Sequence, residues 1–104
     1  MLLMNIYFFM LEVVPCESNP ESEYLGGAFV NCWVKAETME DAFDEAVKDL
    51  EFQGWEFVRI EDEYITERER YLDNPESLEC YDEACEYGMS GVFYTYPIED
   101  ESEN

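Results

Sequence analysis

The sequence predicts a single α+β domain over residues 1–104, a two-layer sandwich in which a four-stranded sheet carries two helices on one face. A chain of 104 residues is long enough for one hydrophobic core and too short for two. Its hydrophobic content of 47% can fill that core although the formal net charge is -22. The hydrophobic pattern also alternates between the periods of strands and helices, in the order β-β-α-β-α-β.

The first two strands are predicted from two different apolar patterns. Residues 4–14 are almost continuously apolar, which predicts a strand that is central or buried on both faces. Residues 15–27 are rich in proline, serine and glycine, which predicts a loop. Residues 28–36 alternate, which predicts a second strand. Its small, core-facing residues are Ala28, Val30, Cys32, Val34 and Ala36, and its outward residues are Phe29, Asn31, Trp33 and Lys35.

The apolar start of the chain lacks the features of an export signal. No basic residue precedes the apolar run, Glu12 follows it directly, and Pro15-Cys16 is not a small-residue cleavage site. The run is also too short to span a bilayer. We therefore expect it to form a buried strand of a soluble, cytoplasmic protein.

Residues 39–52 form the clearest predicted helix, because their apolar residues recur at helical spacing. Thr38 precedes the helix as a natural N-cap, with Asp41 three residues later, and Gly54 suits a left-handed exit. The apolar positions are Met39, Ala42, Phe43, Ala46, Val47 and Leu50.

The second half of the chain predicts a strand, a helix and a strand. Residues 55–60 form the third strand, which can extend to residue 66. Asn74 caps a second helix over residues 75–87, with Pro75 at its first position and Gly88 after its end. Residues 92–98 form the last strand, and residues 99–104 an acidic, flexible tail. The predicted inward stripe of the second helix is Leu78, Tyr81, Ala84 and Cys85.

The connections between these elements predict the layering of the domain. Strand-helix-strand connections prefer right-handed crossovers, and we expect them to place both helices on the same face of the sheet. The result would be close to a ferredoxin-like plait in style, without its exact strand order.

Catalytic and metal-binding motifs are not found in this sequence. It contains no histidine, no glycine-rich phosphate loop, no nucleophile elbow, no CxxC pair and no calcium loop. Cys80 and Cys85 lie about 140° apart around a helix and cannot face one metal ion. We expect Cys16, Cys32, Cys80 and Cys85 to be free structural thiols rather than disulfides or a zinc site, and we expect no enzyme activity, cofactor or metal.

Acidic residues supply the candidate binding surface. The net charge of -22 far exceeds the magnitude of about 2 to 8 that keeps a small domain soluble. Acids three or four residues apart on a helix are about 5–6 Å from one another, which is of the same order as the spacing of phosphates along a nucleic-acid strand. The second helix carries Glu79, Asp82, Glu83 and Glu86, and the first carries Asp41, Asp44 and Glu45.

These features favour a small acidic inhibitor that occupies the basic nucleic-acid-binding surface of a bacterial defence nuclease or its complex, acting as a nucleic-acid mimic. In charge and size the chain resembles the phage anti-CRISPR and antirestriction proteins that mimic DNA, and no residue motif contributes to this resemblance. The alternatives are an immunity protein or antitoxin that neutralises a basic toxin, a small-molecule binding or accessory domain, and a halophilic housekeeping domain. Direct nucleic-acid binding is disfavoured because phosphate would be repelled, and no membrane contact is expected.

Aromatic residues are the candidate anchors of an interface. Phe29, Trp33 and Trp55 are expected on the sheet face opposite the helices, where they would form a partner-binding or homodimer patch. The alternative is that a second helix layer, or the loop of residues 15–27, covers that face.

Overall fold

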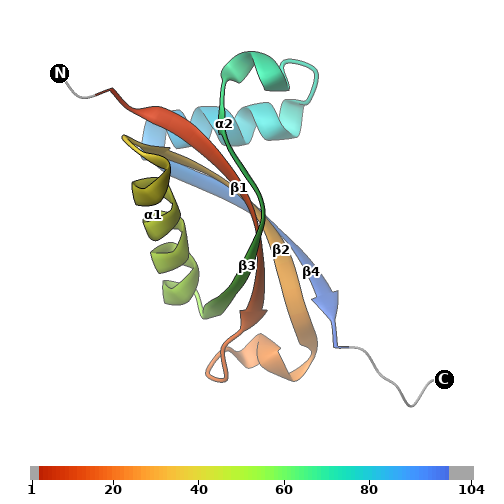
Figure 1. Cartoon of the computed structure of the whole chain (residues 1–104). Coiled ribbons are helices and arrows are strands. Elements are labelled where there is room, and N and C mark those ends of the chain that lie inside the picture. Colours follow the sequence, from red (N-terminus) through yellow and green to blue (C-terminus); the bar gives the residue numbers. More distant parts are fainter. Residues whose placement is uncertain (1–2, 99–104) are drawn as a thin grey trace.

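The computed structural model describes residues 3–98, which form an α+β fold with a four-stranded antiparallel sheet and two α-helices, as predicted. The strands are β1 (Asn5–Pro15), β2 (Leu25–Ala36), β3 (Trp55–Thr66) and β4 (Met89–Pro97). The helices are α1 (Met39–Phe52) and α2 (Pro75–Tyr87), and two 3-10 helices, η1 (Pro20–Glu23) and η2 (Arg68–Tyr71), lie in connecting segments. Figure 1 shows these elements along the chain.

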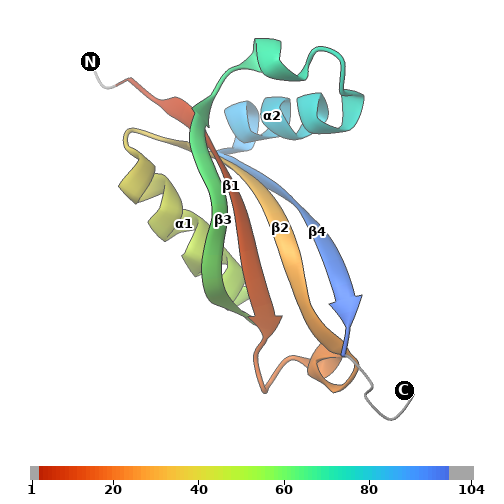
Figure 2. The ribbon, with the colours of Figure 1, turned by 45° about the vertical axis from the view of Figure 1, so that its right-hand side comes forward.

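The sheet has the strand order β3-β1-β2-β4, so β1 and β2 are central while β3 and β4 form the edges. Each neighbouring pair is antiparallel. The ladder between β1 and β3 contains two register shifts, whereas the ladder between β2 and β4 is regular from Gly27 to Val34. The strands are long and strongly twisted, and Figure 2 shows β3 and β4 on the two sides of the central pair.

The apolar run of β1 supplies side chains to both faces of the sheet. Successive strand residues point to opposite faces, so Phe8 and Phe9 enter different cores. The first core holds Tyr7, Phe9, Leu11 and Val13, and the second holds Ile6 and Phe8. The prediction that β1 is central and buried on both faces is confirmed.

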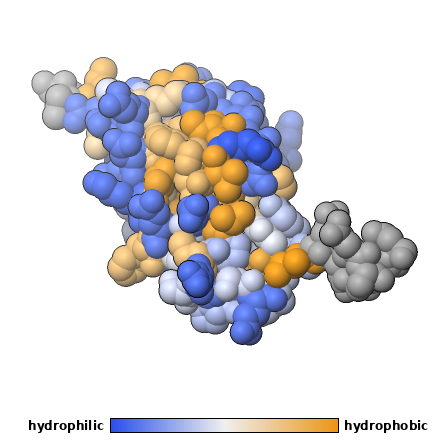
Figure 3. Space-filling model, turned by 60° about the horizontal axis from the view of Figure 1, so that its bottom comes forward, coloured by the Kyte–Doolittle hydropathy of each residue, from blue (hydrophilic) through white to orange (hydrophobic). Residues whose placement is uncertain are grey.

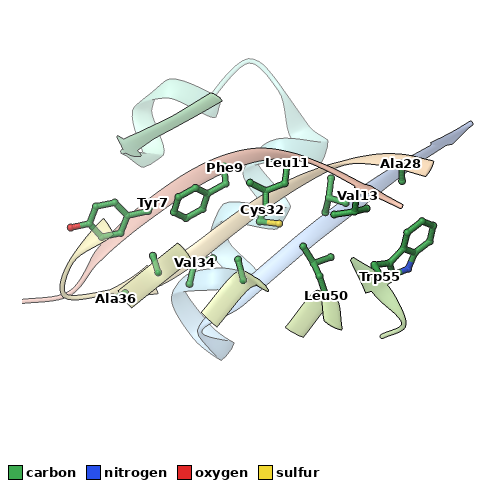
Figure 4. Packing of buried hydrophobic residues seen from close by; sticks show 13 residues of the cluster. Tyr7, Phe9, Leu11, Val13, Ala28, Cys32, Val34, Ala36, Leu50 and Trp55 are labelled. Atoms are coloured by element: carbon green, nitrogen blue, oxygen red, sulfur yellow. The ribbon is translucent and has the colours of Figure 1, made fainter. Parts of the chain in front are cut away.

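The larger core lies between the sheet and α1. The core-facing residues predicted for β2 all belong to it, and Ala42, Ala46 and Leu50 of α1 cover them. Figure 4 shows Phe9 and Leu11 of β1 and Cys32 of β2 in this layer, where Phe9 pairs with Cys32. Thr38 accepts a hydrogen bond from the Asp41 N–H at 3.1 Å, so the predicted N-cap is present and fixes where α1 begins.

The smaller core lies between the opposite face of the sheet and α2. It contains Phe8, Trp33 and Tyr71 together with the small residues Cys80 and Ala84 of α2. Asn74 accepts a hydrogen bond from the Ser77 N–H at 3.2 Å, and Gly88 ends the helix in a left-handed conformation with φ of 99°.

The two helices therefore lie on opposite faces of the sheet, and the predicted two-layer, ferredoxin-like arrangement with both helices on one face is wrong. The right-handed crossover rule applies to parallel strands. It covers β2-α1-β3, because both strands are antiparallel to β1 and hence parallel to each other. The connection through α2 joins antiparallel strands at the two sheet edges, so that rule does not decide its face.

Several predicted boundaries and orientations also change. β2 begins at Leu25 and β4 at Met89, both earlier than predicted, and neither 3-10 helix was predicted. Cys85 is exposed rather than part of the inward stripe of α2, where Cys80 takes its place. The predicted tail of residues 99–104 lies outside the described residues. Within residues 3–98, neither helix combines the length and the apolar composition needed to cross a membrane.

The core on the α1 side can be tested by removing one ring. Phe9 is 0% exposed, whereas Phe52, at the end of α1, is 92% exposed. Phe9→Ala should lower the free energy of unfolding by about 3–5 kcal/mol, because it removes a buried ring and leaves a cavity. Phe52→Ala is the matched control and should change it by less than about 0.5 kcal/mol in urea unfolding. Equal effects of the two substitutions would contradict the assignment of this core.

Candidate protein-binding surface

The acids of α2 lie on its outer side. Cys80 and Ala84 are buried against the sheet and fix the rotation of the helix about its axis. The predicted acids Glu79, Asp82, Glu83 and Glu86 are consequently all exposed.

Two of these four acids make contacts within the domain. Asp82 forms a bidentate pair with Arg68, with Nε–Oδ1 and Nη2–Oδ2 distances of 3.0 and 3.2 Å. Hydrogen bonding to the guanidinium lowers the pKa of the Asp82 carboxyl below its ordinary 3.8. Glu83 accepts a hydrogen bond from Ser90 at 3.4 Å. Glu79 and Glu86 have neither an ion pair nor a side-chain hydrogen bond within residues 3–98, so they are the free carboxylates among these four acids.

The acids of α1 lie beside a shallow depression that also contains two lysines. Asp41, Asp44 and Glu45 are exposed, as predicted. They border a depression of about 280 Å³ at the end of β2. Its complete lining is Met4, Lys35, Ala36, Glu37, Asp41, Asp44, Glu45 and Lys48.

The two groups of acids lie on opposite faces of the sheet but approach each other at one end of it. Lys35 borders the depression beside α1, and its Nζ donates a hydrogen bond to the Cys85 carbonyl of α2 at 3.2 Å. Figure 1 shows the end of α2 and the start of α1 at the same end of the sheet. The structure thus brings the α1 acids near the C-terminal end of α2, rather than arranging all seven acids in one flat row.

Four of the five basic side chains make contacts within the domain. Arg59 pairs with Glu12 and Glu61, and Arg68 pairs with Asp82. The Arg70 guanidinium lies 4.2 Å from the centre of the Tyr64 ring, a cation–π contact. Because Lys35 and Lys48 lie among acids, the positive charges of the chain have acidic or aromatic neighbours and leave most of the exposed carboxylates uncompensated.

The predicted aromatic patch does not exist as a surface. Trp33 is 2% exposed and packs in the α2 core, with its ring centre 5.2 Å from that of Phe8. Trp55 is 5% exposed and packs in the α1 core, on the other side of the sheet. Only Phe29, 36% exposed and 5.7 Å from the Tyr96 ring centre, borders solvent. The expectation was wrong for Trp33 because α2 covers the face assumed to be open, and wrong for Trp55 because its side chain lies on the α1 face of the sheet.

Apolar surface is nevertheless available between the charged residues. Figure 3 shows one face of the molecule on which apolar residues gather in the middle, bounded by hydrophilic ones. On β3 the exposed apolar side chains are Val58, Ile60 and Ile65. Exposed apolar side chains are therefore available on the surface of this domain as well as exposed acids.

A groove between α1 and β4 was not predicted from the sequence. Its volume is about 290 Å³, and it is bordered by Leu50, Asp49 and Gln53 of α1 and by Gly91 and Phe93 of β4, among others. The sequence feature that points to this region is the lack of any charged residue in β4, in a chain that is 31% charged.

The buried thiols of Cys32 and Cys80 are not in their reactive, deprotonated form. Burial, with a further contribution from Asp49, raises the pKa of Cys32 to about 12. Burial and then neighbouring carboxylates raise the pKa of Cys80 as well. Both thiols stay protonated at neutral pH, and the thiolate is the nucleophilic form. The four cysteines are all free, and residues 3–98 contain no cluster of three or more acidic, cysteine or histidine side chains placed to hold a metal ion.

Comparisons with protein families, with curated proteins and with solved structures return no match to this chain.

The Asp82–Arg68 pair can be tested through the pKa of the Asp82 carboxyl. Since the pKa of Asp82 is lowered in the folded state, the pair stabilises the fold above pH 3.8, and this contribution is lost as the pH falls through the lowered pKa. Arg68→Gln should raise the pKa of Asp82 back toward 3.8, as measured by carboxyl-carbon NMR titration. Arg70→Gln, which alters a cation stacked on Tyr64 instead, is the control and should leave the Asp82 titration unchanged. An identical Asp82 pKa in wild type and Arg68→Gln would contradict the pair.

Proposed function

We propose that this chain is a small acidic inhibitor that binds the basic nucleic-acid-binding surface of a bacterial defence nuclease or its complex and excludes the nucleic acid. The observation that carries the proposal is the set of exposed carboxylates on two capped helices, most of which have no cationic partner within residues 3–98. The proposal assigns no chemical reaction to the chain.

The scaffold supports this proposal because it holds the carboxylates in place. Each helix has an N-cap hydrogen bond and buries small residues against the sheet, so its outer face is fixed in rotation. Neighbouring acids at three- and four-residue spacing lie about 5–6 Å apart. A cationic groove that binds phosphates would meet negative charge at a comparable spacing.

The charge supports fast and selective encounter, while affinity needs a desolvated contact. A field from a net charge of -22 attracts a cationic surface and repels nucleic acid and other acidic proteins. Most binding energy in protein interfaces comes from a few buried, central residues. Exposed apolar residues such as Ile60 and Val58 of β3 could supply such contacts.

An immunity protein or antitoxin that neutralises a basic toxin nuclease would use the same surface. The two functions differ in the partner and share the physical mechanism, so the identity of the nuclease that binds separates them.

The proposal is tested by competition against a panel of purified nucleases. Restriction endonucleases, guide-RNA-loaded effector complexes and basic toxin nucleases are each loaded with fluorescent nucleic acid at low salt, and the full chain is added in molar excess. We expect the fluorescence anisotropy of at least one member to fall as nucleic acid is released, and the release to diminish as salt rises. Retention of nucleic acid by every member at low salt would contradict the proposal.

Charge reversal on α2 tests whether the acids act by position or only by net charge. The double substitution Glu79→Lys and Glu86→Lys should weaken binding to the responding nuclease by at least about tenfold at low salt and reduce its salt dependence. Both residues are exposed, so the fold should be retained.

The matched control changes the net charge by the same amount at the other end of the sheet. This control is the double substitution Glu21→Lys and Glu23→Lys. Both residues belong to η1, which Figure 1 shows far from α2. We expect this control to retain most of the affinity. Equal losses in both double variants would mean that overall charge, rather than the helix surface, determines binding.

A further inference from the structure

The two edges of the sheet differ in how they are protected against pairing with another strand. β3 carries five charged residues and two register shifts in its ladder with β1, both of which discourage pairing at an edge. β4 carries no charged residue. No strand pairs with its outer side in the described part of the chain, and Figure 2 shows it at the rim of the sheet. From Met89 to Tyr96, the β4 edge therefore has neither the charges nor the register shifts that protect the β3 edge.

The register identifies which β4 backbone groups are free. Hydrogen-bonded and non-hydrogen-bonded pairs alternate in an antiparallel ladder. The Lys35 N–H donates to the Gly88 carbonyl at 2.9 Å, which sets the phase of this alternation. Lys35 and Gly88 are thus a hydrogen-bonded pair, and every second pair, beginning with that of Met89, is not hydrogen-bonded. The β4 residues in these other pairs direct their N–H and C=O groups away from β2, and they are Met89, Gly91, Phe93 and Thr95.

The free backbone groups lie beside the groove described above. The Phe93 side chain lies on the α1 face with its partner Val30, Gly91 pairs with Cys32 on the same face, and all four residues border the groove. Gly91 leaves the groove floor open because it has no side chain. A strand added beside β4 would therefore direct every second side chain into an apolar groove with Asp49 at its border.

The other face of the same edge is bordered by acids of α2. Tyr94 donates a hydrogen bond to Glu76 at 3.4 Å, and Ser90 donates one to Glu83 at 3.4 Å. The alternate side chains of an added strand would point toward these carboxylates. The edge thus favours a segment in which apolar and basic residues alternate.

We propose that the β4 edge binds an extended segment of the basic partner as a fifth strand, with apolar side chains in the groove beside α1 and basic side chains toward Glu76 and Glu83. The inference rests on the proposed function in taking the partner to be cationic. A second copy of this chain is the disfavoured occupant, because two chains of net charge -22 repel each other.

The probe for this edge is a short capped peptide of alternating valine and lysine, with a peptide of alternating valine and glutamate as its control. The full chain, labelled with nitrogen-15, is mixed with each peptide, and amide hydrogen exchange is followed by NMR. We expect the lysine peptide to slow exchange at Gly91, Phe93 and Thr95, whose N–H groups point outward, and the glutamate peptide to have no effect.

A proline substitution removes one outward N–H without breaking the β2–β4 ladder. Thr95 is exposed and pairs with Ala28 at a non-hydrogen-bonded position. Thr95→Pro should bind the lysine peptide about tenfold more weakly than the matched control Thr95→Val, the ratio expected for one lost buried hydrogen bond. Should Thr95→Pro unfold, Thr95→Lys keeps the backbone and places a charge of the peptide's own sign on the edge, so it should weaken binding too.

The outcomes separate this inference from the proposed function. If Thr95→Pro and Thr95→Val bind equally and no β4 amide is protected, the edge is not the site, although nuclease inhibition through the helix acids can still hold. A dimer of the unliganded chain in sedimentation, lost in Thr95→Pro, would also overturn the inference, because the edge would then belong to a second copy. Protection at β4 with failure of the whole nuclease panel would reject the proposed function and keep the edge as a peptide site.

Discussion

The structure depends on the burial of β1 from both sides. This central strand has neighbours on each edge and a core on each face, and five of its side chains from Ile6 to Val13 are at most 6% exposed with Phe9, Leu11 and Val13 fully buried. One strand therefore has to be covered by two helices, one per face. That requirement sets the position of α1 and α2, and with them the position of the acids that the helices carry.

Charged side chains are almost completely excluded from the two cores that cover β1. Glu12 is the acid of β1, and its carboxylate is retained by an ion pair with Arg59 and a hydrogen bond from Tyr96 at 2.9 Å. The seven acids proposed to bind the partner are all exposed, so their repulsion is screened by solvent. A dry core and a wet, negative surface explain how a chain of net charge -22 can form a compact domain, and why a cationic partner would relieve its self-repulsion.

Local features of the fold were predictable because they depend on neighbours in the sequence. The bounds of α1, the caps Thr38 and Asn74, and the left-handed Gly88 follow from side-chain chemistry within a few residues. The exposure of the acids followed from helical periodicity. The face of the sheet that α2 covers could not be predicted in this way. It depends on contacts between distant segments such as Trp33 with Tyr71, whose ring centres are 5.9 Å apart. The apolar run of β1 already carried that signal, since a strand buried on both faces needs cover on both.

Two-sided burial of β1 can be tested with proton–proton nuclear Overhauser contacts from its two adjacent rings, Phe8 and Phe9. Burial on both faces predicts that the Phe9 ring contacts Phe43 of α1, with ring centres 6.0 Å apart. It predicts that the Phe8 ring contacts Trp33, which in turn contacts Tyr71 on the α2 side. Contacts from both Phe8 and Phe9 to α1, or from neither ring to its assigned core, would contradict the two-sided burial of β1.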